Sequence, residues 1–104
     1  MPFYYDLRIP EFGPSDRREN LVFEKWIIAE KKMIEAGTAL AVVRRCETAY
    51  LLRNAGPGLF TPWNVHEGEG VAEEQPFGRI TTDGELIPYG RPYVTFEIVA
   101  STKL

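Results

Sequence analysis

The chain has 104 residues, of which 44% are hydrophobic and 26% charged, a composition that suits one soluble globular domain with a modest core. The formal net charge of −3 and the lack of a long basic block give little support for nucleic-acid binding. No apolar run is long enough to span a bilayer and no signal peptide is visible, so we expect a cytoplasmic protein. The single cysteine, Cys46, excludes an intrachain disulfide and fits that compartment.

Short strands are predicted along most of the chain. Residues 3–9 are aromatic and β-branched and precede a loop rich in proline, glycine and serine at 10–20. Further strands are predicted at residues 38–45, 48–53, 59–65, 77–82 and 93–99. Turns separate them at 54–58, at 66–70 and at Asp83-Gly84, a dipeptide that tolerates positive φ. Apolar and polar side chains alternate over 92–99, which predicts a strand with one buried face.

Residues 16–36 carry a different signal. Their large apolar side chains recur at near-helical spacing, with Ser15 and Gly37 placed as helix caps. Taken alone, this segment predicts an amphipathic helix and therefore an α+β fold.

An internal repeat of 37 residues favours strands in the same segment. The second copy carries Pro62, Gly68, Gly70 and Pro76, which disfavour a helix, so the first copy is expected to be extended as well. The repeat pairs Phe23 with Phe60, Trp26 with Trp63, Ile28 with Val65, Glu30 with Glu67, Ile34 with Val71, Leu40 with Phe77, and Val43 with Ile80.

Both copies of the repeat resemble parts of a known domain. Residues 65–71 (Val-His-Glu-Gly-Glu-Gly-Val), with Gln75-Pro76-Phe77, Ile80 and Asp83-Gly84-Glu85 after them, resemble the second half of a lipoyl domain. Residues 26–43 resemble the first half without a gap, and residues 7–13 (Leu-Arg-Ile-Pro-Glu-Phe-Gly) resemble the opening strand. The resemblance to the biotin/lipoyl attachment family covers about residues 5–85.

The resemblance implies an all-β barrel-sandwich hybrid: two antiparallel four-stranded sheets related by a pseudo-twofold axis. We expect a single domain over residues 1–104, with residues 86–104 contributing an added C-terminal strand. A lone exposed edge strand invites pairing, so this strand is also a possible route to a homo-oligomer.

In that family the cofactor is attached to a lysine at the tip of an exposed β-hairpin. The family's spacing, counted back from Gly58, puts the tip at Arg45-Cys46-Glu47-Thr48, with Glu47 at the position of the acceptor lysine. No lysine lies between Lys32 and Lys103. The sequence therefore implies a carrier-like domain that holds neither lipoate nor biotin.

Two alternatives keep the carrier function. Lys32, in Glu30-Lys-Lys-Met33, faintly echoes the biotin-acceptor motif, but no glycine turn follows at the expected distance. Cys46 would carry an acyl group or redox adduct if Arg44 and Arg45 favoured its thiolate. A free cysteine more often fills space, and no second cysteine or nearby histidine supports a reactive role here.

Four carboxylates, those of Glu67, Glu69, Glu73 and Glu74, form a candidate docking patch for a basic partner, although a solvated turn needs no function. Five other side chains are expected to be structural or solvated. They are the arginines Arg44 and Arg45, the only histidine, His66, and the repeat-related pair Trp26 and Trp63, expected as core aromatics.

The sequence thus predicts a non-catalytic binding module with no metal site and no nucleic-acid or membrane partner. Carrier domains of the family dock onto acyltransferases, dehydrogenases, carboxylases or ligases, so the resemblance implies a partner enzyme of that kind. The alternative is a lipoyl- or biotinyl-type swinging-arm carrier modified at Cys46 or at an unexpected lysine.

Overall fold

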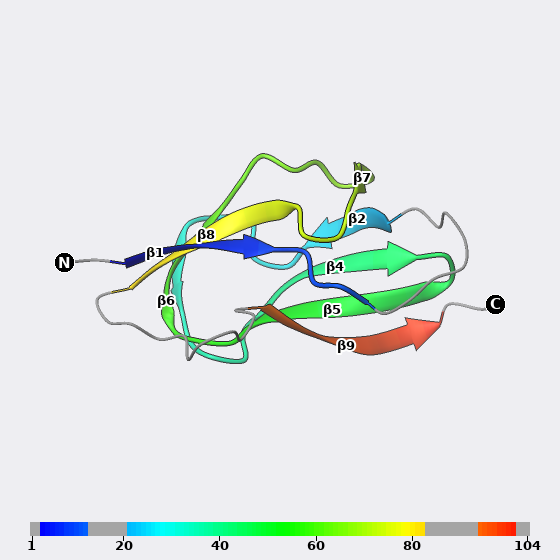
Figure 1. Cartoon of the computed structure of the whole chain (residues 1–104). Coiled ribbons are helices and arrows are strands. Elements are labelled where there is room, and N and C mark those ends of the chain that lie inside the picture. Colours follow the sequence, from blue (N-terminus) through cyan, green and yellow to red (C-terminus); the bar gives the residue numbers. More distant parts are fainter. Residues whose placement is uncertain (1–2, 13–20, 83–93, 102–104) are drawn as a thin grey trace.

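A computed structural model describes residues 3–12, 21–82 and 94–101, and over these residues the protein is all-β with no helix (Figure 1). The strands are β1 (Phe3–Arg8), β2 (Leu21–Trp26), β3 (Lys32–Ile34), β4 (Ala39–Arg45), β5 (Thr48–Asn54), β6 (Gly58–Pro62), β7 (Gly70–Val71), β8 (Pro76–Thr82) and β9 (Val94–Ser101). The expected turn at Asp83-Gly84 and the first part of the predicted added strand, residues 86–93, lie outside the described residues.

The strands form two antiparallel sheets, and no closed barrel is present in the described part of the chain. The first sheet, sheet A, has the order β1-β8-β6-β3, and the second, sheet B, has the order β7-β2-β4-β5-β9. Figure 1 shows β1 and β8 above β4 and β5, with β9 below β5 at the bottom of the view. All of the pairings are antiparallel.

The two sheets are related by an internal symmetry. If β1 to β8 are counted in a cycle, each strand of sheet A has a counterpart four places further on, so that β5 corresponds to β1 and β4 to β8. Replacing the strands of sheet A by their counterparts gives the order β5-β4-β2-β7, which is the order of sheet B read in reverse without β9. The sequence repeat agrees with this, since shifting β4 (Ala39–Arg45) by 37 residues gives the bounds of β8, Pro76–Thr82.

The helix considered for residues 16–36 is wrong over its described part, residues 21–36, because β2 and β3 lie there. The near-helical spacing of the apolar side chains in this segment comes from a β-bulge in β2. The register of β2 against β4 shifts between Phe23 and Lys25, so Phe23 and Trp26 come to the same face although they are three residues apart. Their ring centroids lie 4.6 Å apart.

The core lies between the sheets and repeats the symmetry. Phe23 and its repeat partner Phe60 are both completely buried, as are Leu40 and its partner Phe77. The tryptophan pair departs from the expectation: both side chains are half-buried, but Trp26 packs against the core, whereas the Trp63 ring lies 5.9 Å from the Arg79 guanidinium carbon.

β9 has no counterpart in the symmetry and extends sheet B beyond β5. Of its side chains at 94–99, Val94 is buried, whereas Phe96, Ile98 and Val99 are 38%, 64% and 45% exposed. The expected buried face is therefore wrong for most of the strand. The reason is geometric: sheet B has five strands and sheet A four, so no described strand of sheet A covers β9.

Candidate functional site

The hairpin of β4 and β5 contains the four residues that sequence analysis put at its tip. β4 ends at Arg45, β5 begins at Thr48, and these two residues are partners in the register. Cys46 and Glu47 form the connection, and both are exposed. Cys46 has a φ of 55°, in the left-handed region that a two-residue hairpin turn requires.

Two arginines hold the hairpin below the tip. Nη2 of Arg45 donates to the backbone oxygen of Phe12 at 3.5 Å and to the Tyr50 hydroxyl at 3.4 Å. Nε of Arg44 lies 2.6 Å from Oε1 of Glu24 on the neighbouring strand β2. The two side chains are therefore engaged within the domain and position the hairpin on sheet B.

The chemistry that the tip offers is limited by Glu47. Attachment of lipoate or biotin through an amide needs a primary amine, and Glu47 presents a carboxylate instead. Of the described lysines, Lys25 lies on β2, Lys32 begins β3 and Lys31 directly precedes it, so none of them lies in the β4–β5 turn. The thiol of Cys46 is exposed beside Glu47.

The four glutamates of the candidate docking patch lie in two loops, and three of their carboxylates make hydrogen bonds to the backbone. Glu67 accepts from the N–H of Trp26 at 2.9 Å, Glu69 from that of His66 at 2.8 Å, and Glu73 from that of Phe12 at 3.0 Å. These carboxylates therefore stabilise the end of β2, the β6–β7 loop and the segment after β1, a role that sequence reasoning missed.

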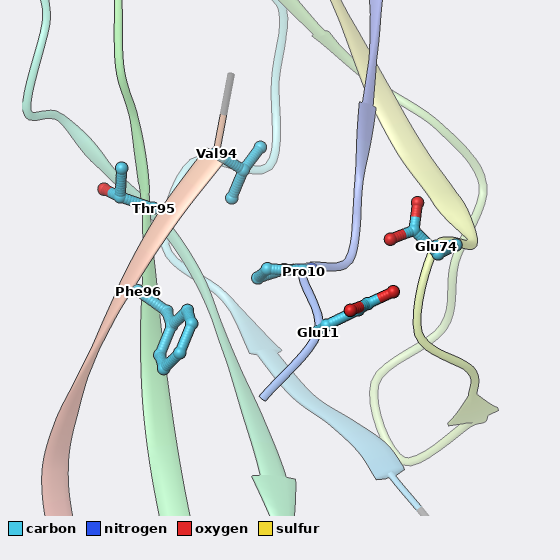
Figure 2. Close-up of a pocket in the computed structure, with 6 residues that line it drawn as sticks. All are labelled: Pro10, Glu11, Glu74, Val94, Thr95 and Phe96. Carbon is cyan, nitrogen blue, oxygen red and sulfur yellow. The ribbon is translucent and has the colours of Figure 1, made fainter. Parts of the chain in front are cut away.

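Glu74 is placed differently. Its backbone has a φ of 71°, and its backbone N–H donates to the backbone oxygen of Ile9. The backbone oxygen of Glu74 accepts a hydrogen bond from the Arg8 guanidinium. The Glu74 side chain lines an open pocket of about 480 Å³ together with Pro10, Glu11, Val94, Thr95 and Phe96 (Figure 2). These residues come from three distant segments of the chain, which is why no sequence pattern indicated the pocket.

No group of three or more His, Cys, Asp or Glu side chains gathers at metal-binding distances in the described residues. The same residues contain no helix long and apolar enough to cross a membrane. His66, the only histidine, is exposed in the β6–β7 loop.

The chain was compared with family models, with curated proteins and with solved structures, and none of them matches it.

Proposed function

We propose that the chain is a non-catalytic, carrier-like binding module that has the barrel-sandwich architecture of lipoyl and biotinyl domains but no covalently attached cofactor. In this proposal the β4–β5 hairpin is the counterpart of the cofactor-bearing hairpin, and Glu47 stands where those domains have a lysine. The module acts by docking to a partner enzyme of the acyltransferase, dehydrogenase, carboxylase or ligase classes.

Two features of the fold support the architectural part. Replacing each strand of sheet A by its counterpart four places further on in the cycle from β1 to β8 gives the reversed strand order of sheet B without β9. A pseudo-twofold barrel-sandwich requires this relationship. The 37-residue sequence repeat relates β2, β3 and β4 to β6, β7 and β8. β9 is then an addition to an eight-stranded symmetric unit.

The observation that carries the functional part is the exposed two-residue turn Cys46-Glu47 between β4 and β5. A carrier needs a mobile amine at this turn, and the turn has a carboxylate and a thiol. Arg44 and Arg45 of β4 anchor the hairpin to Glu24 of β2 and to the backbone of Phe12, which supports a role for the hairpin in presenting its turn.

The test restores the amine. Incubation with a lipoate ligase or a biotin ligase should leave the mass of the wild-type protein unchanged, whereas Glu47→Lys should gain the mass of one lipoyl group in intact mass spectrometry. Lipoylation is expected because Thr48-Ala49 is closer to a lipoyl than to a methionine-flanked biotinyl context.

Two matched controls move the amine by one residue in either direction, Cys46→Lys and Thr48→Lys, and both should be modified less. Equal modification of all three variants would show that the turn is not read as an acceptor hairpin. Modification of the wild-type protein, either in the ligase reaction or after isolation from its native host, would establish the alternative, a carrier modified at Cys46 or at another lysine.

A further inference from the structure

β9 is held to the domain unevenly along its length. Its first residue, Val94, is 3% exposed, and the Phe96 ring packs on two aromatic neighbours at centroid distances of 4.8 and 5.5 Å. Towards the other end of the strand, Ile98 and Val99 are 64% and 45% exposed. The apolar burial that holds the strand in place therefore decreases from the start of β9 to its end.

A β-bulge divides the strand where this burial is lost. Residues 94–98 pair with residues 50–54 in an unbroken register, whereas Val99 has no partner in that register. Beyond the bulge, residues 100–101 pair with residues 48–49. Because a bulge disrupts the ladder of backbone hydrogen bonds, these two pairs are separated from the anchored half of the strand.

The weakly held end of β9 lies along the flank of the β4–β5 hairpin. Ser101 is opposite Thr48, the residue that directly follows the turn Cys46-Glu47 (Figure 1). Since β5 lies between β4 and β9 in sheet B, residues 100–101 occupy the outer backbone edge of the hairpin next to its turn. In this closed arrangement Ala49 is buried and Thr48 is half-buried.

The hairpin does not depend on this end of β9 for its position. Arg44 is paired with Glu24 of β2, and Arg45 donates a hydrogen bond to the segment after β1. β4 and β5 also pair with each other as far as the turn. Release of residues 99–101 would therefore leave the turn in place and uncover the edge of β5 beside it.

We propose that residues 99–101 form a strap that opens and closes over the flank of the hairpin, with the bulge at Val99 as its hinge. The closed strap occupies the outer edge of residues 48–49. The open strap exposes this edge to a docking partner while residues 94–96 stay anchored. Opening thus controls how readily a partner enzyme reaches the turn, and in this respect the inference rests on the proposed function.

Amide hydrogen exchange of the wild-type protein, followed residue by residue by NMR, tests the strap directly. Among the amides that bond across the β5–β9 pairing, those at 48–49 and 99–101 should exchange about a hundredfold faster than those at 51–54 and 94–97, because only the former are released by local opening. The amides of β5 that bond to β4 should stay protected. Uniform protection along β9, or release of the whole strand at one rate, would overturn the proposal.

A single thiol under the strap measures the uncovering. In Cys46→Ser/Ala49→Cys the introduced thiol lies at a position that is 4% exposed, so its reaction with a maleimide should be limited by opening. Adding Ala100→Pro should speed labelling about tenfold, because proline lacks the N–H and breaks the pairing of the strap.

Ala36→Pro is the matched control for the labelling rate. Ala36 is exposed and precedes Gly37, whose φ is 86°, in a turn closed by a hydrogen bond from Thr38 to Glu35. Proline suits this position of a turn, so Ala36→Pro should leave the labelling rate unchanged. If Ala100→Pro labels no faster than Ala36→Pro, the strap does not cover the hairpin and the proposal is wrong.

Lipoylation separates this proposal from the proposed function. Glu47→Lys combined with Ala100→Pro should be lipoylated at least about threefold faster than Glu47→Lys alone, because the open state is then more populated. Equal rates would show that the strap does not control docking. If neither variant is lipoylated, the proposed function fails, whereas amide exchange and thiol labelling still decide whether the strap exists.

Discussion

The carboxylate of Glu73 accepts a hydrogen bond from the backbone N–H of Phe12 at 3.0 Å, across 61 residues of sequence. The bond joins the segment after β1 to the loop between β7 and β8. It also fixes Phe12, whose ring stacks on Tyr50 with centroids 4.2 Å apart. A residue selected as a candidate for docking therefore has a structural role.

We predict that Glu73→Ala lowers the free energy of unfolding by about 1–2 kcal/mol, because a part-buried backbone N–H loses a charged acceptor. Glu73→Gln keeps an acceptor oxygen and should lose less. Glu30→Ala, at an exposed position without such a bond, should stay within about 0.5 kcal/mol of wild type. Urea unfolding measures all three. Equal stability of Glu73→Ala and Glu30→Ala would contradict the assigned role.

The second prediction concerns Gly78 in β8, where the sheet has no room for a side chain. A Cβ atom at Gly78 would lie 2.9 Å from Cε1 of Phe60 and 3.1 Å from the backbone oxygen of Thr61. Phe60 is completely buried and cannot move aside. Gly78→Ala should therefore destabilise the protein by about 1–3 kcal/mol, as overpacked cores do.

Gly70→Ala in β7 is the matched control, because the nearest atom to its added Cβ is 3.9 Å away. Its thermal midpoint should stay close to that of wild type. If the two variants melt at the same temperature, β6 and β8 do not approach as closely as the structure has them.

The third prediction tests the hairpin turn. A non-glycine residue in the left-handed region costs roughly 1–2 kcal/mol, and Cys46 has a φ of 55°. Cys46→Gly should consequently be more stable than Cys46→Ala by about 1 kcal/mol, since both variants lack the thiol and differ only in the Cβ atom. Glu47→Gly against Glu47→Ala should show no such gain, because Glu47 does not have a positive φ. A difference of the same size and sign at both positions would contradict the turn geometry.

Sequence patterns predicted the strands well where alternation or turn residues were clear. The runs 38–45, 48–53 and 77–82 correspond closely to β4, β5 and β8, and the first strand at 3–9 corresponds to β1. The internal repeat was decisive for 21–34. Hydrophobic spacing alone misled there because the bulge in β2 brings Phe23 and Trp26 to one face, which imitates one turn of a helix.

The candidate site was only partly predictable for a related reason. The turn Cys46-Glu47 follows from local sequence, because a two-residue connection is fixed by its neighbours. The bonds of Glu67 and Glu73 span 41 and 61 residues, and the pocket beside β9 joins residues 10, 74 and 94. Such contacts depend on how the sheets pack, and no periodicity in one sequence encodes them.

The last prediction concerns the two tryptophans that the repeat makes equivalent. The ring centroid of Trp26 lies 4.6 Å from that of Phe23 and 6.2 Å from those of Phe60 and Phe77. The Nε1–H of Trp26 donates to the backbone oxygen of Val65 at 2.9 Å. Trp63 lies against Arg79 on a half-buried surface. Trp26→Phe removes a part-buried hydrogen bond and ring volume and should lower the free energy of unfolding by about 2–3 kcal/mol. Trp63→Phe should lower it by less than about 1 kcal/mol, the strength of an exposed cation–π contact.

Each variant also retains a single tryptophan, which gives a second measurement. In Trp63→Phe the remaining Trp26 should emit at shorter wavelength and resist quenching by acrylamide, whereas in Trp26→Phe the remaining Trp63 should emit at longer wavelength and be quenched readily. Equal stability losses together with equal quenching would mean that the two halves of the molecule pack alike. The symmetry of strand order would then extend to the side chains, and the position of Trp63 beside Arg79, outside the core, would be wrong.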